Sequence, residues 1–389
     1  MSNSRQRSIF LTILPLLIAS LPTCLYAFKD FSDDLAEIAV RHKIPGIASI
    51  AVTDSGITAS GVAGMRKNGG REKITLDDKF HIGSNTKAMT ATLCAMLVED
   101  GKLHWDTTIG DVSPTLKRKM LPQFHAITLE RLLTHRTGIR TEVLGDPQAM
   151  QRLDTFQERF PSPPMTARQR CAEFLVSQSP ATTQDGFIYS NGNYVLLSHM
   201  IEQALGVAFE QAMRDRLFKP LNMKSAGFGA PENEAQNGQP LGHTDDGQPI
   251  ESNSKEADNP QIYAGSGTVH CSLKDWAKFV QFHLTKGNSH PELVHSQAIS
   301  LLHMPKKSKT NPEEFATIAP GSLGYAMGWF VFPNGTLTHS GTNLRWYSQA
   351  VIIPKHNIAL LVACNQGGDG AAKACLETIQ FHIRAQIGR

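Results

Sequence analysis

The sequence predicts an α+β fold in which an antiparallel sheet, built from both chain ends, is flanked by helices and carries an inserted all-helical domain. Three observations predict this arrangement. Strand-like segments gather near the two termini, helical periodicity dominates the middle, and short turn motifs separate the strand-like segments. The chain has 389 residues, 41% of them hydrophobic and 19% charged, so it can bury a large core without disulfides or a structural metal.

Two groups of segments are expected to form the sheet. Near the N-terminus, a helical segment precedes two β-rich segments that are joined by a turn at residues 54–56. Near the C-terminus, Asn334-Gly335 and the turn at residues 354–357 each separate two β-rich segments, and a helix ends the chain. The expected helices cover residues 31–41 and 369–387, and the expected strands cover 46–53, 57–63, 326–332, 336–340, 346–353 and 358–363.

The middle of the chain is expected to be helical, beginning with residues 84–99, whose apolar side chains recur on one face. Two long polar connectors, residues 141–166 and 229–261, have little periodicity and are expected to be functional rims or mobile covers. The other expected helices cover residues 129–133, 167–177, 193–205 and 209–217. We expect a single unit over residues 28–389, with a sheet domain (28–90 plus 255–389), a helical insertion (91–254) and a ligand cleft between them.

Residues 1–27 are expected to be an export signal. Two arginines give a basic start, residues 9–21 form a short apolar run, and Ala27 is a small residue suited to cleavage. A retained anchor is the alternative, but the run is short for a bilayer and Pro15 interrupts it. Lipidation of Cys24 is not expected, because threonine precedes it. We therefore expect a periplasmic or secreted protein without a stable membrane span.

The charge and cysteine patterns exclude several classes of partner. The 38 basic residues less the two in the leader leave 36, against 35 acidic residues, with no long block of like charge. We therefore expect no nucleic-acid partner, no electrostatic partner and a monomer. The odd number of cysteines after the leader, without CxxC spacing, and the scattered histidines predict neither a disulfide framework nor a metal site.

The first candidate for chemistry is Ser84-Asn85-Thr86-Lys87. Positions three apart lie on one face of a helix, so Lys87 can reach the Ser84 hydroxyl and accept its proton if the ammonium is destabilised by burial. Because Ser-x-x-Lys is a weak motif by itself, its context matters. A second copy, residues 252–255, lies in a polar connector and is interpreted as exposed residues. The first copy follows a β-like segment and opens an apolar helix, which is the context that the chemistry needs.

The second candidate is Tyr189-Ser190-Asn191. A phenol near an ammonium can lose its proton more easily and act as general acid or base, and Asn191 offers a donor and an acceptor for a substrate amide. The alternative is a buried tyrosine followed by an asparagine helix cap.

The third candidate is His339-Ser340-Gly341-Thr342, at the end of a predicted strand. Gly341 would let a substrate backbone lie along an exposed strand edge. The backbone N–H groups of Ser84 and Thr342 would then form an oxyanion hole. The alternative is a strand that runs into an ordinary glycine turn.

These three motifs, in this order, resemble those of the serine β-lactamase and penicillin-recognising hydrolase superfamily, on its class C β-lactamase, D-Ala-D-Ala carboxypeptidase and esterase branch. The third motif is similar to the His-Thr-Gly form of some carboxypeptidases and D-aminopeptidases and differs from the usual Lys-Thr-Gly. The likeness runs from about Phe31 to the C-terminal helix. Supporting stretches are residues 80–84, 97–106, 127–129, 132–138 and 264–267.

The resemblance implies a β-lactamase/transpeptidase-like fold and a catalytic role for the whole unit. It implies that Ser84 is the acylated nucleophile, Lys87 its proton acceptor and Tyr189 the general acid/base. Asn191 and the third-motif residues His339, Ser340, Gly341 and Thr342 would bind substrate. It also implies that the enzyme uses no metal and no organic cofactor.

Two departures from the family pattern concern the substrate carboxylate. An unperturbed histidine is mostly neutral at pH 7, so His339 would attract a carboxylate less strongly than lysine. Arg345 follows the third motif and is expected at the rim as a bidentate clamp that supplies the missing cation; the alternative is an exposed strand arginine.

The expected substrate is a small molecule or a peptidoglycan peptide. We expect a β-lactam or a D-amino-acid peptide amide to be hydrolysed through an acyl-enzyme, as in a class C-like β-lactamase or a D-Ala-D-Ala carboxypeptidase. A carboxylesterase of the same fold and a penicillin sensor that acylates without turnover are the alternatives. A catalytically dead scaffold is disfavoured because all three motifs are intact.

Overall fold

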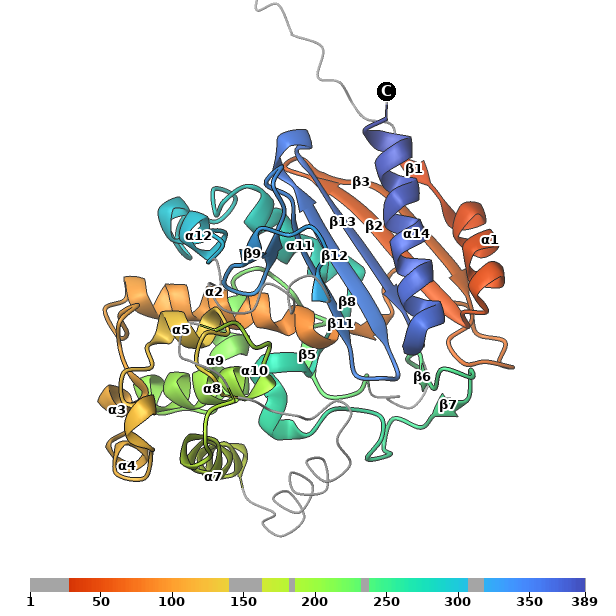
Figure 1. Ribbon diagram of the computed structural model, residues 1–389. Helices are drawn as coiled ribbons and strands as arrows, with labels where there is room; N and C mark the ends of the chain where they lie inside the picture. The colour runs from red at the N-terminus through yellow and green to blue at the C-terminus, as the bar shows by residue number, and fades with distance from the viewer. Residues whose placement is uncertain (1–27, 140–162, 182–185, 232–237, 307–317, 389) are drawn as a thin grey trace, which may run out of the picture.

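The structure is a computed structural model that describes residues 28–139, 163–181, 186–231, 238–306 and 318–388. An eight-stranded sheet lies in the upper part of Figure 1, in the order β1-β3-β2-β13-β12-β11-β10-β9. Strand β2 (Gly46–Thr53) pairs antiparallel with β13 (Ile358–Cys364), so strands from the two chain ends lie side by side. The predicted sheet built from both ends is therefore confirmed. The expected leader, residues 1–27, lies outside the described residues, as does most of the expected connector 141–166.

The sheet departs from the prediction at both edges. At one edge, β1 (Lys29–Asp30) pairs parallel with β3 (Gly56–Gly64), so the sheet is mixed; a two-residue strand is too short to leave a periodic signal. At the other edge, the single strand expected over residues 326–332 is replaced by β9 (Gly324–Tyr325) and β10 (Phe330–Val331). Gly328, with φ +90°, bends the chain against α2, where an added Cβ would lie 2.5 Å from the Cα of Ala88.

Helices cover both faces of the sheet (Figure 1). On one face, α1 (Ser32–His42) and α14 (Gly368–Gln386) pack on alternate residues of the strands. On the other face, α11 (Leu273–Leu284) packs on the intervening residues, in a core that also includes α2. Because strand side chains alternate between faces, this division decides which residues of each strand can turn toward α2.

Strands β11 (Leu337–Thr342) and β12 (Tyr347–Ile353) pair antiparallel beside β13 and were both predicted. A separate three-stranded sheet joins β4 (Lys79–His81), β8 (Val269–Ser272) and β5 (Gly227–Phe228). A two-stranded ribbon of β6 (Gly242–His243) and β7 (Pro249–Ile250) lies in the described part of the connector 229–261.

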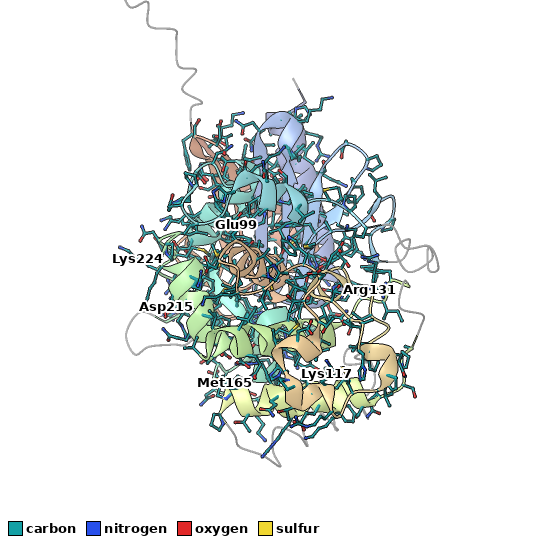
Figure 2. The ribbon with its side chains drawn as sticks, turned by 90° about the vertical axis from the view of Figure 1, so that its left-hand side faces the viewer. Glu99, Lys117, Arg131, Met165, Asp215 and Lys224 are labelled. Atoms are coloured by element: carbon teal, nitrogen blue, oxygen red, sulfur yellow. The ribbon has the colours of Figure 1, made fainter. Side chains whose placement is uncertain are left out.

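The helical region lies below the sheet in Figure 1 and is seen from the side in Figure 2, where Lys117, Met165 and Asp215 mark its outer surface. Helix α2 (Thr86–Glu99) belongs to both regions and is buried from Thr86 to Leu97, because helices and sheet cover it on all sides. The remaining α-helices of the described residues are α3 (Ile109–Val112), α4 (Pro114–Lys117), α5 (Leu129–Leu133), α7 (Pro164–Ser177), α8 (Asn191–Leu205), α9 (Phe209–Met213), α10 (Ala264–Gly267) and α12 (Ser296–Leu302). Among the described residues, none of the helices combines the length and the apolar character that a membrane span requires.

Candidate active site

The fold places Ser84 between β4 and α2. A 3₁₀ turn, Gly83–Asn85, leads from the strand into the helix, so the serine stands one turn before the regular helix that the sequence predicted to begin at residue 84. Gly83 has φ +51°, and a Cβ there would lie 2.4 Å from the backbone nitrogen of Thr342. Only glycine fits this position, and its presence brings the nucleophile's turn against the end of β11.

Lys87 lies completely buried beside the serine. Its Nζ is 3.1 Å from Ser84 Oγ, 2.8 Å from Asn191 Oδ1 and 2.8 Å from the carbonyl oxygen of Ser266. Burial lowers the pKa of Lys87 well below 10.5. The two carbonyl oxygens can only accept hydrogen bonds, so a neutral Lys87 amine donates its two N–H groups to them. Its lone pair is then directed toward the Ser84 hydroxyl. The geometry is that of a serine activated by a lysine base.

Tyr189 completes the contact with the nucleophile. Its phenol is hydrogen-bonded to Ser84, and Lys87 Nζ lies 4.9 Å from the centre of its ring. The sequence led us to expect that a nearby ammonium would ease loss of the phenolic proton. In the structure the pKa of Tyr189 shifts in the opposite direction. Burial raises this pKa, and the hydrogen bond to Ser84 offsets only part of the rise. Tyr189 therefore keeps its proton in the free enzyme and is placed to donate it.

Asn191 is the first residue of α8, and Ser190 takes the capping position before it. The Asn191 side chain is turned to Lys87 instead of capping the helix. The structure thus brings Ser84, Lys87, Tyr189 and Asn191 together from two separate segments.

His339 and Gly341 lie on the face of β11 that turns toward α2. A Cβ at Gly341 would lie 2.7 Å from the backbone nitrogen of Ser84, so the backbones of the first and third motifs are in direct contact. His339 is buried, its Nδ1–H donates to the carbonyl oxygen of Ser340 at 2.6 Å, and its Nε2 accepts from the Tyr325 hydroxyl at 3.2 Å. Burial and the nearby Lys87 lower the pKa of His339 to about 3, so the imidazole is neutral.

Three predicted substrate-binding side chains are engaged elsewhere. Ser340 lies on the opposite face of β11, where its hydroxyl is hydrogen-bonded to the Tyr347 phenol, so its side chain does not join Ser84. Thr342 shares that face, and its hydroxyl accepts from the Leu344 amide at 2.9 Å, which leaves its backbone as the part that meets the site. The Arg345 guanidinium lies 3.2 Å from the Glu256 carboxylate, so a carboxylate of the chain itself already binds it.

Tyr325 was not predicted, and it contacts the site through its hydroxyl, 3.2 Å from His339 Nε2, and through its ring, whose centre lies 6.2 Å from that of Tyr189. The buried His135 lies beside the second motif, and its two ring nitrogens have different surroundings. His135 Nδ1 accepts from the Ser190 amide at 3.1 Å and faces the Asn193 amide at 3.2 Å, whereas its Nε2 has no hydrogen-bond partner. Its ring centre lies 4.5 Å from that of Tyr189, so His135 supports the loop that carries the phenol.

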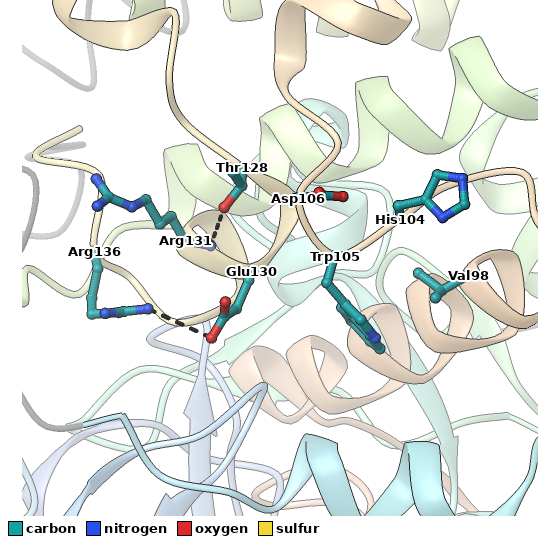
Figure 3. A pocket seen from close by; sticks show the side chains of 8 residues that line it. All are labelled: Val98, His104, Trp105, Asp106, Thr128, Glu130, Arg131 and Arg136. Atoms are coloured by element: carbon teal, nitrogen blue, oxygen red, sulfur yellow. Dashed lines mark hydrogen bonds and ion pairs between the residues drawn. The ribbon is translucent and has the colours of Figure 1, made fainter.

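A groove of about 640 Å³ lies near the C-terminal part of α2 (Figure 3). Trp105 gives it an aromatic wall, and Glu130 in it pairs with Lys306 at 2.5 Å and lies 3.7 Å from Arg136. None of the predicted site residues lines this groove. The described residues contain no cluster of three or more His, Cys, Asp or Glu that could hold a metal ion.

Comparisons with known proteins agree with this geometry. The sequence matches the family model "Beta-lactamase" over residues 28–381. It is 31% identical to penicillin-binding protein 4 of Amycolatopsis lactamdurans over 186 residues, which cover 48% of this chain and 45% of that protein. The chain spans less than two thirds of the length of the first curated relatives that it matches.

Solved structures show the same fold. A class C beta-lactamase from Rhodobacter sphaeroides superposes with a TM-score of 0.68 at 19% identity, covering 90% of this chain and 98% of that one. A D-stereospecific amidohydrolase from Streptomyces sp. gives a TM-score of 0.67 at 21% identity, covering 88% and 96%. The predicted β-lactamase/transpeptidase-like fold is therefore confirmed. The chain belongs to the beta-lactamase and penicillin-binding-protein family of serine hydrolases.

Proposed function

We propose that this chain hydrolyses an amide, a β-lactam or a D-amino-acid peptide, through an acyl-enzyme on Ser84. The observation that carries the proposal is the buried Lys87 amine, 3.1 Å from Ser84 Oγ, which has no carboxylate among its hydrogen-bond partners in the described part of the chain. Ser84 Oγ attacks the substrate carbonyl carbon while Lys87 takes the hydroxyl proton. The negative oxygen that forms lies at the backbone amides of Ser84 and Thr342.

Collapse of this intermediate breaks the C–N bond and leaves an ester on Ser84. Tyr189 donates its phenolic proton to the leaving nitrogen and regains one from the Lys87 ammonium. Water then attacks the ester carbonyl, gives a proton to the same lysine–tyrosine pair, and frees the acid product and Ser84. All of these steps are proton transfers and acyl transfers by residues of this chain.

The printed names of relatives support an amide substrate, since they include a penicillin-binding protein and a D-stereospecific amidohydrolase. A β-lactamase and a D-Ala-D-Ala carboxypeptidase are the two activities that we propose within this class. The expected leader, residues 1–27, supports action outside the cytoplasm, where such substrates occur.

A second candidate, a carboxylesterase of the same fold, is favoured by one observation. His339 is neutral and the Arg345 cation is paired with Glu256, so the site offers no unpaired cation on the third motif for a substrate carboxylate. A simple ester needs none.

Mass spectrometry on the intact protein tests these proposals. We expect an adduct of one acyl group with a penicillin, a D-Ala-D-Ala peptide or a phenyl ester, and none with Ser84→Ala. Rapid loss of the adduct with a penicillin indicates a β-lactamase, whereas a single product equivalent and a lasting adduct indicate a sensor. Acylation by esters alone supports the carboxylesterase. Labelling that persists in Ser84→Ala would overturn the assignment of the nucleophile.

A further inference from the structure

Four consecutive residues of the connector 229–261 contact three different segments around Ser84. We call residues 256–259 the clasp. Its contacts are Glu256 Oε2 with Arg345 Nη2 at 3.2 Å, the Ala257 carbonyl with Asn343 Nδ2 at 3.1 Å, Asp258 Oδ1 with His81 Nε2 at 2.6 Å, and Asn259 Nδ2 with the Gly267 carbonyl at 2.7 Å. The clasp therefore joins the strand before the nucleophile, the chain after the third motif, and the residue after Ser266.

The contact between Asp258 and His81 stands nearest the nucleophile. His81 is fully buried, whereas Asp258 is partly exposed. The second ring nitrogen of His81, Nδ1, lies 3.2 Å from the backbone nitrogen of Gly83. An amide N–H can only donate, so Nδ1 is the acceptor and the ring proton of the neutral imidazole is on Nε2, where it donates to Asp258. The carboxylate thus fixes the tautomer that the Gly83 amide requires.

Gly83 passes this constraint to the reacting groups. The bonded N–H belongs to the Ile82–Gly83 peptide, which meets the Gly83–Ser84 peptide at the Gly83 Cα, and a Cβ on that Cα would lie too close to the Thr342 nitrogen for any side chain to fit. A rotation of the Ile82–Gly83 peptide would therefore be passed through the Gly83 Cα and turn the Ser84 amide away from the position that it shares with Thr342. Small errors in the position of such a donor are costly to a transition state.

We propose that His81 and Asp258 are positioning residues that orient the Gly83 backbone N–H, and through the Gly83 Cα the Ser84 amide, for oxyanion stabilisation, and that the clasp holds them in place. This inference rests on the proposed acyl-enzyme function. It gives the connector a specific part in acylation, in place of the general covering role that its composition suggested.

Two substitutions of His81 test separately the hydrogen bonds that its two ring nitrogens make. In His81→Asn, the side-chain oxygen replaces Nδ1 as acceptor for Gly83 and the contact with Asp258 is lost. In His81→Gln, the amide reaches Asp258 and the acceptor for Gly83 is lost. We expect kcat for acylation to fall about 10- to 100-fold in His81→Gln with little change in KM. His81→Asn restores most of this loss, and Asp258→Ala gives an intermediate loss. Lys255→Ala, next to the clasp and exposed, is the control and keeps wild-type kcat.

Two results would overturn the inference. One is a kinetic result that indicates a merely structural histidine: kcat is the same in His81→Gln as in wild type, or kcat falls equally in His81→Gln and His81→Asn. The other is a ¹⁵N NMR spectrum of histidine-labelled protein in which the His81 proton is on Nδ1. The spectrum does not depend on turnover, so it tests the inference even if wild-type protein forms no adduct, the result that defeats the proposed function.

Discussion

Lys87 and Arg168 are both basic side chains with no exposed surface, yet the structure surrounds them in opposite ways. Arg168, on α7 in the helical region, makes paired hydrogen bonds to Glu202 and Glu210 at 2.5 to 2.9 Å. Burial would lower the pKa of Arg168, but the bonds to Glu210 and Glu202 raise it overall. Lys87 has only neutral oxygens as partners, and burial lowers its pKa.

The difference shows that burial alone does not decide what a charged group does. With two carboxylates, a buried guanidinium stays charged and ties helices together. Without any, a buried amine is driven toward its neutral form and can take a proton. Arg168 thus stabilises the fold as a cation, whereas Lys87 is suited to act as a base.

Exchanging each basic side chain for methionine should produce the largest and most divergent effects. Lys87→Met removes the base, so we expect kcat to fall at least about 10³-fold, with stability unchanged or increased because a poorly compensated group leaves the core. Arg168→Met strands two carboxylates in the interior and should cost about 3–5 kcal/mol of unfolding free energy. Urea denaturation measures the unfolding free energy of each variant, and the rate per titrated active site measures its kcat. If Lys87→Met were strongly destabilised, the contrast between the two side chains would not hold.

The pH dependence of the wild type sharpens the contrast. Since the folded pKa of Lys87 is below 10.5, acylation should rise with pH as the amine loses its proton and level off well below 10.5. Between these two pKa values the unfolded chain binds more protons, so unfolding free energy should rise with pH there. Lys87→Met should lack that rise.

Asn191→Asp makes the surroundings of Lys87 resemble those of Arg168. A carboxylate in place of the amide oxygen 2.8 Å from Nζ should stabilise the ammonium and raise the pKa of Lys87. We expect the rise of kcat/KM with pH to move upward and the rate at pH 7 to fall about 10- to 100-fold. Asn191→Ala is the matched control, since it removes the oxygen without adding charge. An unshifted profile in Asn191→Asp would show that Lys87 is not the group that titrates.

The smallest effect is expected at the rim, where Arg345 is paired with the exposed carboxylate of Glu256. Glu256→Gln frees the guanidinium, so KM for carboxylate-bearing substrates should fall about two- to fivefold while neutral esters are unaffected. Arg345→Ala should act in the opposite direction on the same substrates. Equal changes on esters and carboxylates would reject Arg345 as a carboxylate clamp.

Local sequence signals predicted most of the fold, because strands such as 46–53 and 358–363 carry strong hydrophobic patterns between clear turns. The Ser84–Lys87 contact was predictable for the same reason, as it depends on helix spacing alone. Contacts between segments that are far apart in the sequence could not be predicted in this way. Nothing local indicates that Asp258 meets His81 across 177 positions.

The orientation of the third-motif side chains and the pKa of Tyr189 could not be predicted from the sequence, because both depend on how the chain packs. Ser340 and Gly341 are adjacent in sequence, but only the pairing of β11 with β12 shows which of them turns toward α2. The direction of the Tyr189 pKa shift depends on how completely the ring is enclosed, which no motif reports.

The enclosure of α2 from Thr86 to Leu97 has a consequence for protein engineering. Each substitution on that helix alters tightly packed neighbours, so a library directed at it will mostly yield unfolded variants. Diversity is better introduced at Leu344, just after the third motif, where a side chain that is 54% exposed can be exchanged without repacking the interior.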